Sequence, residues 1–202
     1  MQRQQGRHRP AAVQAHPAGR TAIPPLPPAS LARAERAVAE GVEHHRAGRF
    51  AEAEAQYQQA LSHEPAHAEA LHLLGLLAHQ LGQYDLAVGL IGRAIISADD
   101  RPWYYLNIGA SLQALGRLDL AIRTYRQAIA LRPAYPEALN NLGVALQAQG
   151  ALDEAIACFE QAIALQPAYA EAHFNLGVAR QVLDDRDGEE ALPHAQPTEP
   201  AA

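Results

Sequence analysis

Residues 136–169 read PEALNNLGVALQAQGALDEAIACFEQAIALQPAY, and this stretch decides the fold. Its leucines recur at spacings of three and four, which predicts one apolar stripe on a helix: Leu139, Leu142 and Leu146. Pro136 suits the first turn of that helix, because the N–H that proline lacks would have no partner there. Gly150 is typical of a helix end, since glycine adopts the left-handed conformation at low cost.

The second half of the stretch predicts a second helix. Asp153 and Glu154 place negative charge at its start, which the helix dipole favours. A small-large-small face follows, at Ala155, Phe159 and Ala162, and Pro167 ends the helix. Gly143 lies inside the first helix, where glycine costs about 1 kcal/mol relative to alanine. The simplest reason for that glycine is the close approach of a neighbouring helix.

The same pattern recurs along the chain, and every column of it repeats with one constant period. The turn glycines are Gly48, Gly82, Gly116 and Gly150. The glycines inside the first helices are Gly41, Gly75, Gly109, Gly143 and Gly177. The small-large-small columns are Ala53, Ala87, Ala121 and Ala155; Tyr57, Ile91, Tyr125 and Phe159; and Ala60, Ala94, Ala128 and Ala162. Chance does not maintain so many registers over four copies, so the sequence predicts a repeat array.

These columns resemble the tetratricopeptide repeat family, whose pattern sets a large residue, Leu-Gly, Ala, an aromatic residue, a second Ala and Pro at fixed offsets. The resemblance implies an all-α fold, a right-handed superhelix of antiparallel helix pairs with four full repeats and a half-repeat cap. The expected units are about 34–67, 68–101, 102–135 and 136–169, followed by the half-unit 170–183. Beyond it, Asp184 replaces the turn glycine and Pro193 interrupts any second helix.

The two ends differ from the array, which we assign to residues 30–183. The segment 1–29 is expected to be a disordered leader rich in Arg and Pro, since positions 1–34 hold five arginines and no acidic residue. A polyproline ligand for a partner, a targeting segment and a misassigned start remain alternatives for this leader. Residues 184–202 are acidic and proline-containing without periodicity, so we expect a disordered tail.

The composition excludes several function classes. The chain has 22 acidic and 16 basic residues, a net charge of −6, which argues against binding to nucleic acid or to an anionic membrane. All the basic residues are arginine, so chemistry that needs lysine is excluded. The single cysteine, Cys158, lies in a regular helix and is not expected to be a nucleophile. The string HEPAH at 63–67 matches a zinc-protease motif, but Pro65 interrupts the helix that such a site needs. We expect no catalysis, no cofactor, no metal and, by default, a cytoplasmic location.

Equivalent positions of the first helices are expected to line an extended concave surface. One such row is Asn107, Asn141 and Asn175, with Asn140 beside it; a second row, six positions further on, is His45, His79, Gln113, Gln147 and Gln181. An amide side chain both donates and accepts hydrogen bonds, so a row of amides suits the backbone of an extended peptide. The alternative is that these side chains are simply polar residues on a solvated face.

Trp103 interrupts a row of carboxylates at another groove position, formed by Glu35, Glu69, Glu137 and Glu171. It is either a binding anchor or a local packing repair. The carboxylates favour a basic or neutral ligand segment, although a solvated face explains them equally well. A chaperone-tail carboxylate clamp, as in some relatives, needs Lys and Asn where this chain has Val38 and Val42. That class of partner is therefore not expected.

Three functional interpretations remain. The first is a non-catalytic scaffold that binds an extended peptide or protein segment in the concave groove. In the second, units with Asn-Leu-Gly-Val-Ala-Leu followed by Asp-Glu-Ala-Ile are similar to arrays that precede bacterial O-linked N-acetylglucosamine transferase domains. That similarity implies a separated or truncated substrate-recognition arm. The third is a homodimer formed through the C-terminal half-repeat, where Phe174, Val178 and Val182 are expected to be exposed.

Overall fold

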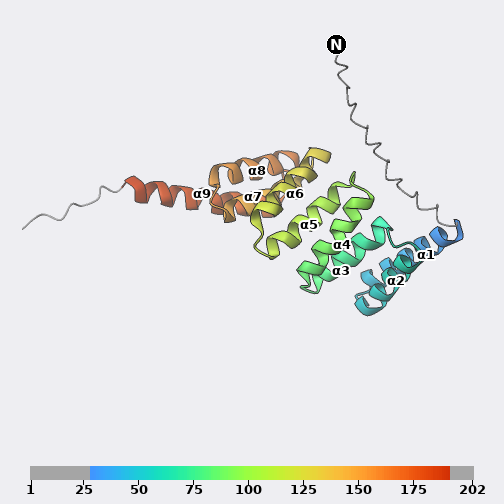
Figure 1. Cartoon of the computed structure of the whole chain (residues 1–202). Helices are drawn as coiled ribbons and strands as arrows, with labels where there is room; N and C mark the ends of the chain where they lie inside the picture. Colours follow the sequence, from blue (N-terminus) through green and yellow to red (C-terminus); the bar gives the residue numbers. More distant parts are fainter. Residues whose placement is uncertain (1–27, 192–202) are drawn as a thin grey trace, which may run out of the picture.

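The computed structural model describes residues 28–191, which form nine α-helices and no strand (Figure 1). The helices are α1 (Pro28–Arg46), α2 (Phe50–His63), α3 (Ala68–Gln80), α4 (Tyr84–Ser97), α5 (Pro102–Ala114), α6 (Leu118–Leu131), α7 (Pro136–Ala148), α8 (Leu152–Leu165) and α9 (Ala170–Ala191). The all-α class expected from the sequence is confirmed. All but the last two residues of the expected leader, and residues 192–202 of the expected tail, lie outside the described part.

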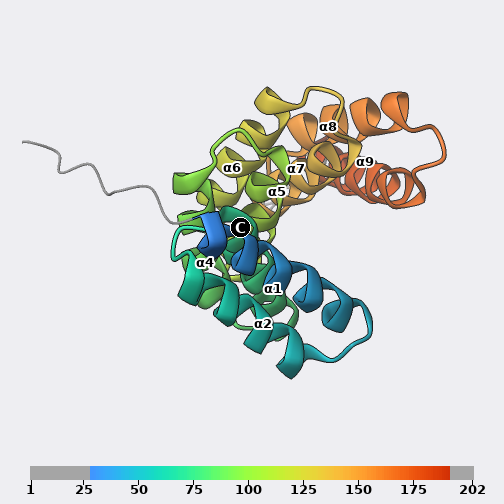
Figure 2. The same cartoon turned by 90° about the vertical axis from the view of Figure 1, so that its right-hand side faces the viewer.

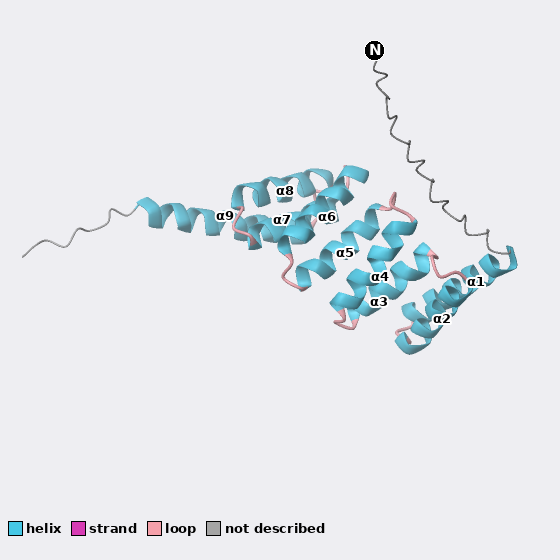
Figure 3. Cartoon of the chain, viewed as in Figure 1, coloured by secondary structure: helices cyan, strands magenta, loops and turns pink. Residues whose placement is uncertain are grey.

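The helices pack as consecutive antiparallel pairs, from α1 with α2 to α7 with α8, and α9 follows as a cap. Short loops join them (Figure 3). Each odd-numbered helix also contacts the next odd-numbered helix, whereas no two even-numbered helices in residues 28–191 contact each other. A stack whose odd-numbered helices lie closer together curves toward them (Figure 2). The odd-numbered helices therefore line the concave face of the array.

Each helix pair turns at a glycine in the left-handed conformation. The φ angles are 70°, 75°, 70° and 86° at Gly48, Gly82, Gly116 and Gly150. A side chain would be strained there, because a Cβ atom crowds the following carbonyl in this conformation. The role that the sequence predicted for this glycine column is confirmed.

The second glycine column makes room for the large side chain of the paired helix. A Cβ atom built on Gly143 would lie 2.5 Å from Cε1 of Phe159, and one on Gly109 would lie 2.5 Å from Cε1 of Tyr125. The other two pairs of this kind are Gly41 with Tyr57 and Gly75 with Ile91. All four large side chains are at most 1% exposed. The close neighbour that Gly143 predicted is thus Phe159, the large central residue of the small-large-small face.

The last helix, α9, has no following helix to pair with in the described part of the chain. Asp184 stands where the other units have the turn glycine, and α9 continues as far as Ala191 instead of ending at residue 183. Without glycine the left-handed turn is costly, so the chain stays in the right-handed helix. A Cβ atom on Gly177 would meet nothing within 4 Å. Phe174 is 71% exposed and Val182 is 44% exposed, while Val178 is half-buried.

Candidate peptide-binding groove

The concave face carries the asparagine row that the sequence singled out. Asn107, Asn141 and Asn175 lie on α5, α7 and α9, and all three are half-buried. Two of them hold neighbouring odd-numbered helices together. The Asn107 amide donates to Nε2 of His72 at 2.8 Å, and the Asn175 amide donates to Oδ1 of Asn140 at 2.9 Å. These side chains thus have partners inside the array, an arrangement that neither the peptide-holding nor the solvated interpretation included.

Asn140 is fully buried between α7 and α9. Besides accepting from Asn175, it donates its own amide to Oε1 of Glu171 at 3.1 Å. Its role in this structure is therefore to connect two helices, because a buried amide needs a partner for each of its polar ends. The notion that Asn140 contacts a ligand stays a prediction.

Asn141 differs from its equivalents, since its side chain has no hydrogen-bond partner among residues 28–191. It lines a hollow of about 380 Å³ together with Gln113, Tyr84 and Val144, and Glu171 closes the hollow from α9. In this member of the row, both the donor and the acceptor of the amide are available to a peptide backbone.

In two units, a member of the second polar row contacts the hydroxyl of a buried tyrosine. The Tyr125 hydroxyl donates to Oε1 of Gln113 at 3.0 Å, and His45 contacts the Tyr57 hydroxyl through Nδ1 at 3.3 Å. Burial raises the pKa of Tyr57 to about 12 and raises that of Tyr125 as well, so both keep their proton at neutral pH. The remaining members differ: His79 bonds Ser111 through Nδ1 at 2.9 Å, Gln147 is half-buried and Gln181 is exposed.

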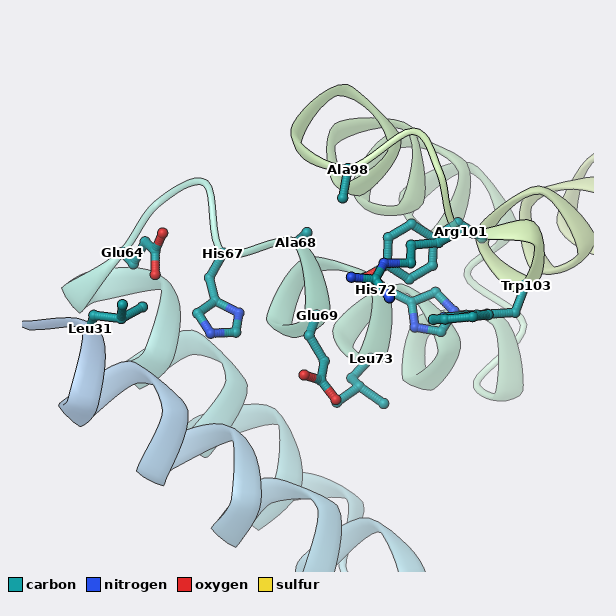
Figure 4. Close-up of a pocket in the computed structure, with 11 residues that line it drawn as sticks. Leu31, Glu64, His67, Ala68, Glu69, His72, Leu73, Ala98, Arg101 and Trp103 are labelled. Atoms are coloured by element: carbon teal, nitrogen blue, oxygen red, sulfur yellow. The ribbon is translucent and has the colours of Figure 1, made fainter. Parts of the chain in front are cut away.

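A larger hollow, of about 610 Å³, is lined by residues of α1, α3 and α5 (Figure 4). Leu31 of α1 lines one side and Trp103 of α5 lines the other, with Glu69 and His72 of α3 between them. Trp103 is 41% exposed, and the Arg101 guanidinium lies 5.5 Å from the centre of its ring. The role of Trp103 as a binding anchor stays a prediction. Arg101 also contacts Asp100 at 3.2 Å, so its charge is already partnered.

A neighbouring hollow of about 470 Å³ continues the groove over α1 and shares His67 and Glu69 with the first. Its floor is apolar, from Val38 and Val42, and its carboxylates are Glu35, Glu43 and Glu69. Glu43 pairs with Arg46 at 3.1 Å. Three carboxylates have no ion-pair partner within residues 28–191. They are Glu35, Glu69 and Glu64, and Glu64 lines the larger hollow.

His72 is the functional candidate that the sequence did not single out. It is only 5% exposed, and its ring centre lies 4.4 Å from that of Tyr104. Burial lowers the pKa of His72 to about 4, so the imidazole is neutral at pH 7. Because Nε2 accepts from the Asn107 amide, the ring proton is on Nδ1. Only the crossing of helices from two repeats reveals this pair, since the two residues are 35 positions apart.

Cys158 and His67 are two further titratable side chains that the sequence analysis considered. Burial raises the pKa of the Cys158 thiol, with Glu154 adding to the effect, so the thiolate is disfavoured. His67, from the HEPAH string, caps α3 by accepting from the Ala70 N–H at 3.2 Å. Within residues 28–191 no group of three His, Cys, Asp or Glu side chains is placed to hold a metal ion. In that part of the chain, every helix is too short or too polar to cross a bilayer.

The helix pairs, the two glycine columns and the concave groove together define a helical repeat protein. Family models of the tetratricopeptide repeat match the sequence, one at residues 38–102 and another, a TPR repeat, at 109–150 and 148–182. Together these matches cover well over half of the chain. The chain therefore belongs to the tetratricopeptide repeat family. No curated protein sequence matches it.

Solved structures share the fold. The structure "MamA MSR-1 C2" superposes with a TM-score of 0.65 at 28% identity, covering 80% of this chain and 92% of that one. The first TPR of Spaghetti (RPAP3), bound to the HSP90 peptide SRMEEVD, gives a TM-score of 0.57 at 26% identity and covers 58% of this chain and 93% of that one. YrrB, described as a TPR protein with an unusual peptide-binding site, gives 0.67 at 23% identity and covers 76% and 79%. At that identity, YrrB supports the fold alone.

Proposed function

We propose that this protein is a non-catalytic interaction scaffold that binds an extended peptide or protein segment in its concave groove. The observation that carries the proposal is the row of three hollows along the odd-numbered helices. Polar side chains that lack an internal partner line these hollows, and the amide of Asn141 and the carboxylates of Glu35 and Glu69 are the main ones. Groups of this kind recognise an extended chain without enclosing it.

The RPAP3 structure supports this proposal, because that repeat array, 26% identical to this chain, holds a peptide. Its peptide, SRMEEVD, is acidic. The groove described above is lined at its α1–α3 end by Glu35 and Glu69, which lack an ion-pair partner in residues 28–191 and disfavour an acidic peptide. The proposed shared feature is therefore peptide binding, with a different ligand.

The test is capture of a partner from lysate by the full-length protein, followed by mapping of the bound segment as a synthetic peptide. We expect Asn141→Ala to weaken binding of the mapped peptide about tenfold, the effect of losing one or two hydrogen bonds to its backbone. Gln127→Ala removes an exposed amide from α6, an outer helix, and serves as the matched control. Equal affinity of wild type and Asn141→Ala would exclude the hollow at Asn141 from the proposed peptide site.

The asparagine row has a second use in this test. Asn107 and Asn175 are bonded inside the array, so replacing them by alanine changes stability as well as any binding. Asn141 alone separates the two effects. If the captured partner is a glycosyltransferase domain, the alternative of a separated substrate-recognition arm replaces the stand-alone scaffold.

We also propose that two copies of the chain pair through α9. The support is the open place at Gly177 beside the exposed ring of Phe174 on the same helix. In each of the four full units a large side chain fills the equivalent glycine position. Antiparallel pairing of two α9 helices lets Phe174 of each copy occupy the place at Gly177 of the other, which is the reciprocal contact that a two-fold interface requires.

The solution mass of the full-length chain tests this pairing. We expect a dimer by light scattering, and a monomer for Phe174→Glu, because a carboxylate cannot enter an apolar contact without a large desolvation cost. Val182→Glu places the same charge on the same helix, further from Gly177, and is expected to weaken the dimer less. A monomeric wild type at concentrations well above the micromolar range would refute the pairing.

A further inference from the structure

The two adjoining hollows over α1, α3 and α5 form one continuous site of mixed chemistry. They have volumes of about 610 and 470 Å³, and they share His67 and Glu69. Apolar groups line the floor, and the half-exposed ring of Trp103 forms one wall. A site of this size admits several residues of an extended chain, with apolar and polar side chains alternating along it.

The charged groups of the site that lack an ion-pair partner are carboxylates. Glu35 and Glu69 are exposed carboxylates on successive concave helices, and neither has an ion-pair partner in the described chain. Glu64 adds a third carboxylate, and its Oε2 is buried without a hydrogen-bond partner. The cation at the rim, Arg101, is already paired with Asp100 and stacked on Trp103. Carboxylates that line one site favour a cationic partner through electrostatic complementarity.

A ring nitrogen of His72 is a second feature that suits a ligand here. His72 is only 5% exposed and lines the larger hollow, and its Nε2 is occupied by the Asn107 amide. The Nδ1–H that remains has no hydrogen-bond partner in residues 28–191. Because His72 lines the hollow, this N–H is available to donate to a peptide carbonyl.

We infer that this site takes an extended peptide segment in which basic residues alternate with apolar ones. The basic side chains pair with Glu35, Glu69 and Glu64. The apolar side chains lie against Leu31, Val38 and the Trp103 ring, and a backbone carbonyl accepts from His72 Nδ1. This inference rests on the proposed function and specifies the ligand class for the α1–α5 end of the same groove.

Trp103 is the single tryptophan of the chain, so its fluorescence reports on this site without any label. The probe is a capped hexapeptide of alternating leucine and arginine, titrated into the full-length protein, with the same peptide carrying glutamate for arginine as the comparison. We expect the arginine peptide to change Trp103 emission and the glutamate peptide to leave it unchanged. Added salt should weaken the binding, because the carboxylates are exposed.

The variant Glu35→Gln/Glu69→Gln is expected to weaken the arginine peptide about five- to tenfold, the effect of losing two exposed ion pairs. Glu52→Gln/Asp153→Asn removes the same charge from two outer helices and should leave the affinity unchanged. The same titration is repeated with the leader arginines Arg3, Arg7, Arg9 and Arg20 replaced by glutamine. Binding that appears only in that variant would support the ligand class and identify the leader as its occupant.

Equal binding of both peptides, tighter binding of the glutamate peptide, or no emission change in either protein would overturn the inference. Those results leave the proposed function untouched, because the Asn141→Ala comparison with the captured partner tests the groove at a different hollow. Conversely, a positive titration together with an unaffected Asn141→Ala variant would confine peptide binding to the α1–α5 end.

Discussion

Replacing Gly143 by alanine is expected to destabilise the protein by about 2–3 kcal/mol, the usual cost of overpacking a buried contact. The new Cβ atom would lie 2.5 Å from a ring carbon of Phe159, which is fully buried and has no room to retreat. The intrinsic preference of helices for alanine acts in the opposite direction, by about 1 kcal/mol, and is too small to compensate. The net sign is therefore set by packing and not by helix propensity.

The same substitution at Gly177 is the internal control, because this glycine has the same register in α9 and open space in place of a paired helix. In the Phe174→Glu background, where no partner ring fills this place, Gly177→Ala is expected to stabilise the protein by about 0.5–1 kcal/mol. Urea denaturation of the two variants, followed by circular dichroism, measures both effects. Shifts of the same sign would contradict the assignment of Gly143 as the place that admits Phe159.

The second large effect is a loss of stability in mild acid. The pKa of His72 is about 4 in the folded protein and close to 6.5 when the chain is unfolded. Between these values the unfolded chain binds the proton and the folded chain does not, so stability falls as the pH drops from about 6.5 to about 4. Proton linkage gives a total decrease of about 3 kcal/mol in the free energy of unfolding over this range. Above pH 6.5 the native state has this contribution in full. Below pH 4 the folded protein also protonates Nε2, and the bond from Asn107 is lost.

His72→Asn separates this effect from the titration of carboxylates. The equivalent residue in the fourth unit is Asn140, whose Oδ1 accepts from Asn175 just as Nε2 of His72 accepts from Asn107. At pH 7 the free energy of unfolding of the variant should be about 1 kcal/mol lower, because the contact with Tyr104 is missing. Between pH 4 and 6.5 the variant should also lose much of the dependence of its stability on pH. Parallel stability curves for wild type and variant over that range would show that another group is responsible.

The fold was predictable from the sequence because its determinants are local and repeated. The turn depends on one glycine with positive φ, and the packing of each pair depends on one glycine facing one large side chain. Both recur once in every full repeat unit, so each copy supports the prediction made for the others. The end of α9 was less predictable: Asp184 shows that the turn is missing, but how far the helix then runs depends on what the free helix contacts.

The partners of the groove side chains were not predictable in the same way. Asn107 and His72 belong to different columns of the repeat and meet only because successive odd-numbered helices are offset by the curvature of the array. Trp103 and Glu69 were recognisable because they lie in one column, where an exception to the pattern is visible without any knowledge of the offset.

The first helix pair is the least firmly attached part of the array. The largest buried cluster extends from Leu71 to Ala179, whereas the buried residues of α1 belong to a smaller, separate cluster. Local unfolding therefore begins most easily with α1 and α2, which contact the rest only through α3. This pair also carries Leu31, Glu35 and Val38. A peptide bound at the proposed site would therefore hold the pair in place, and transient detachment of the pair would release the peptide.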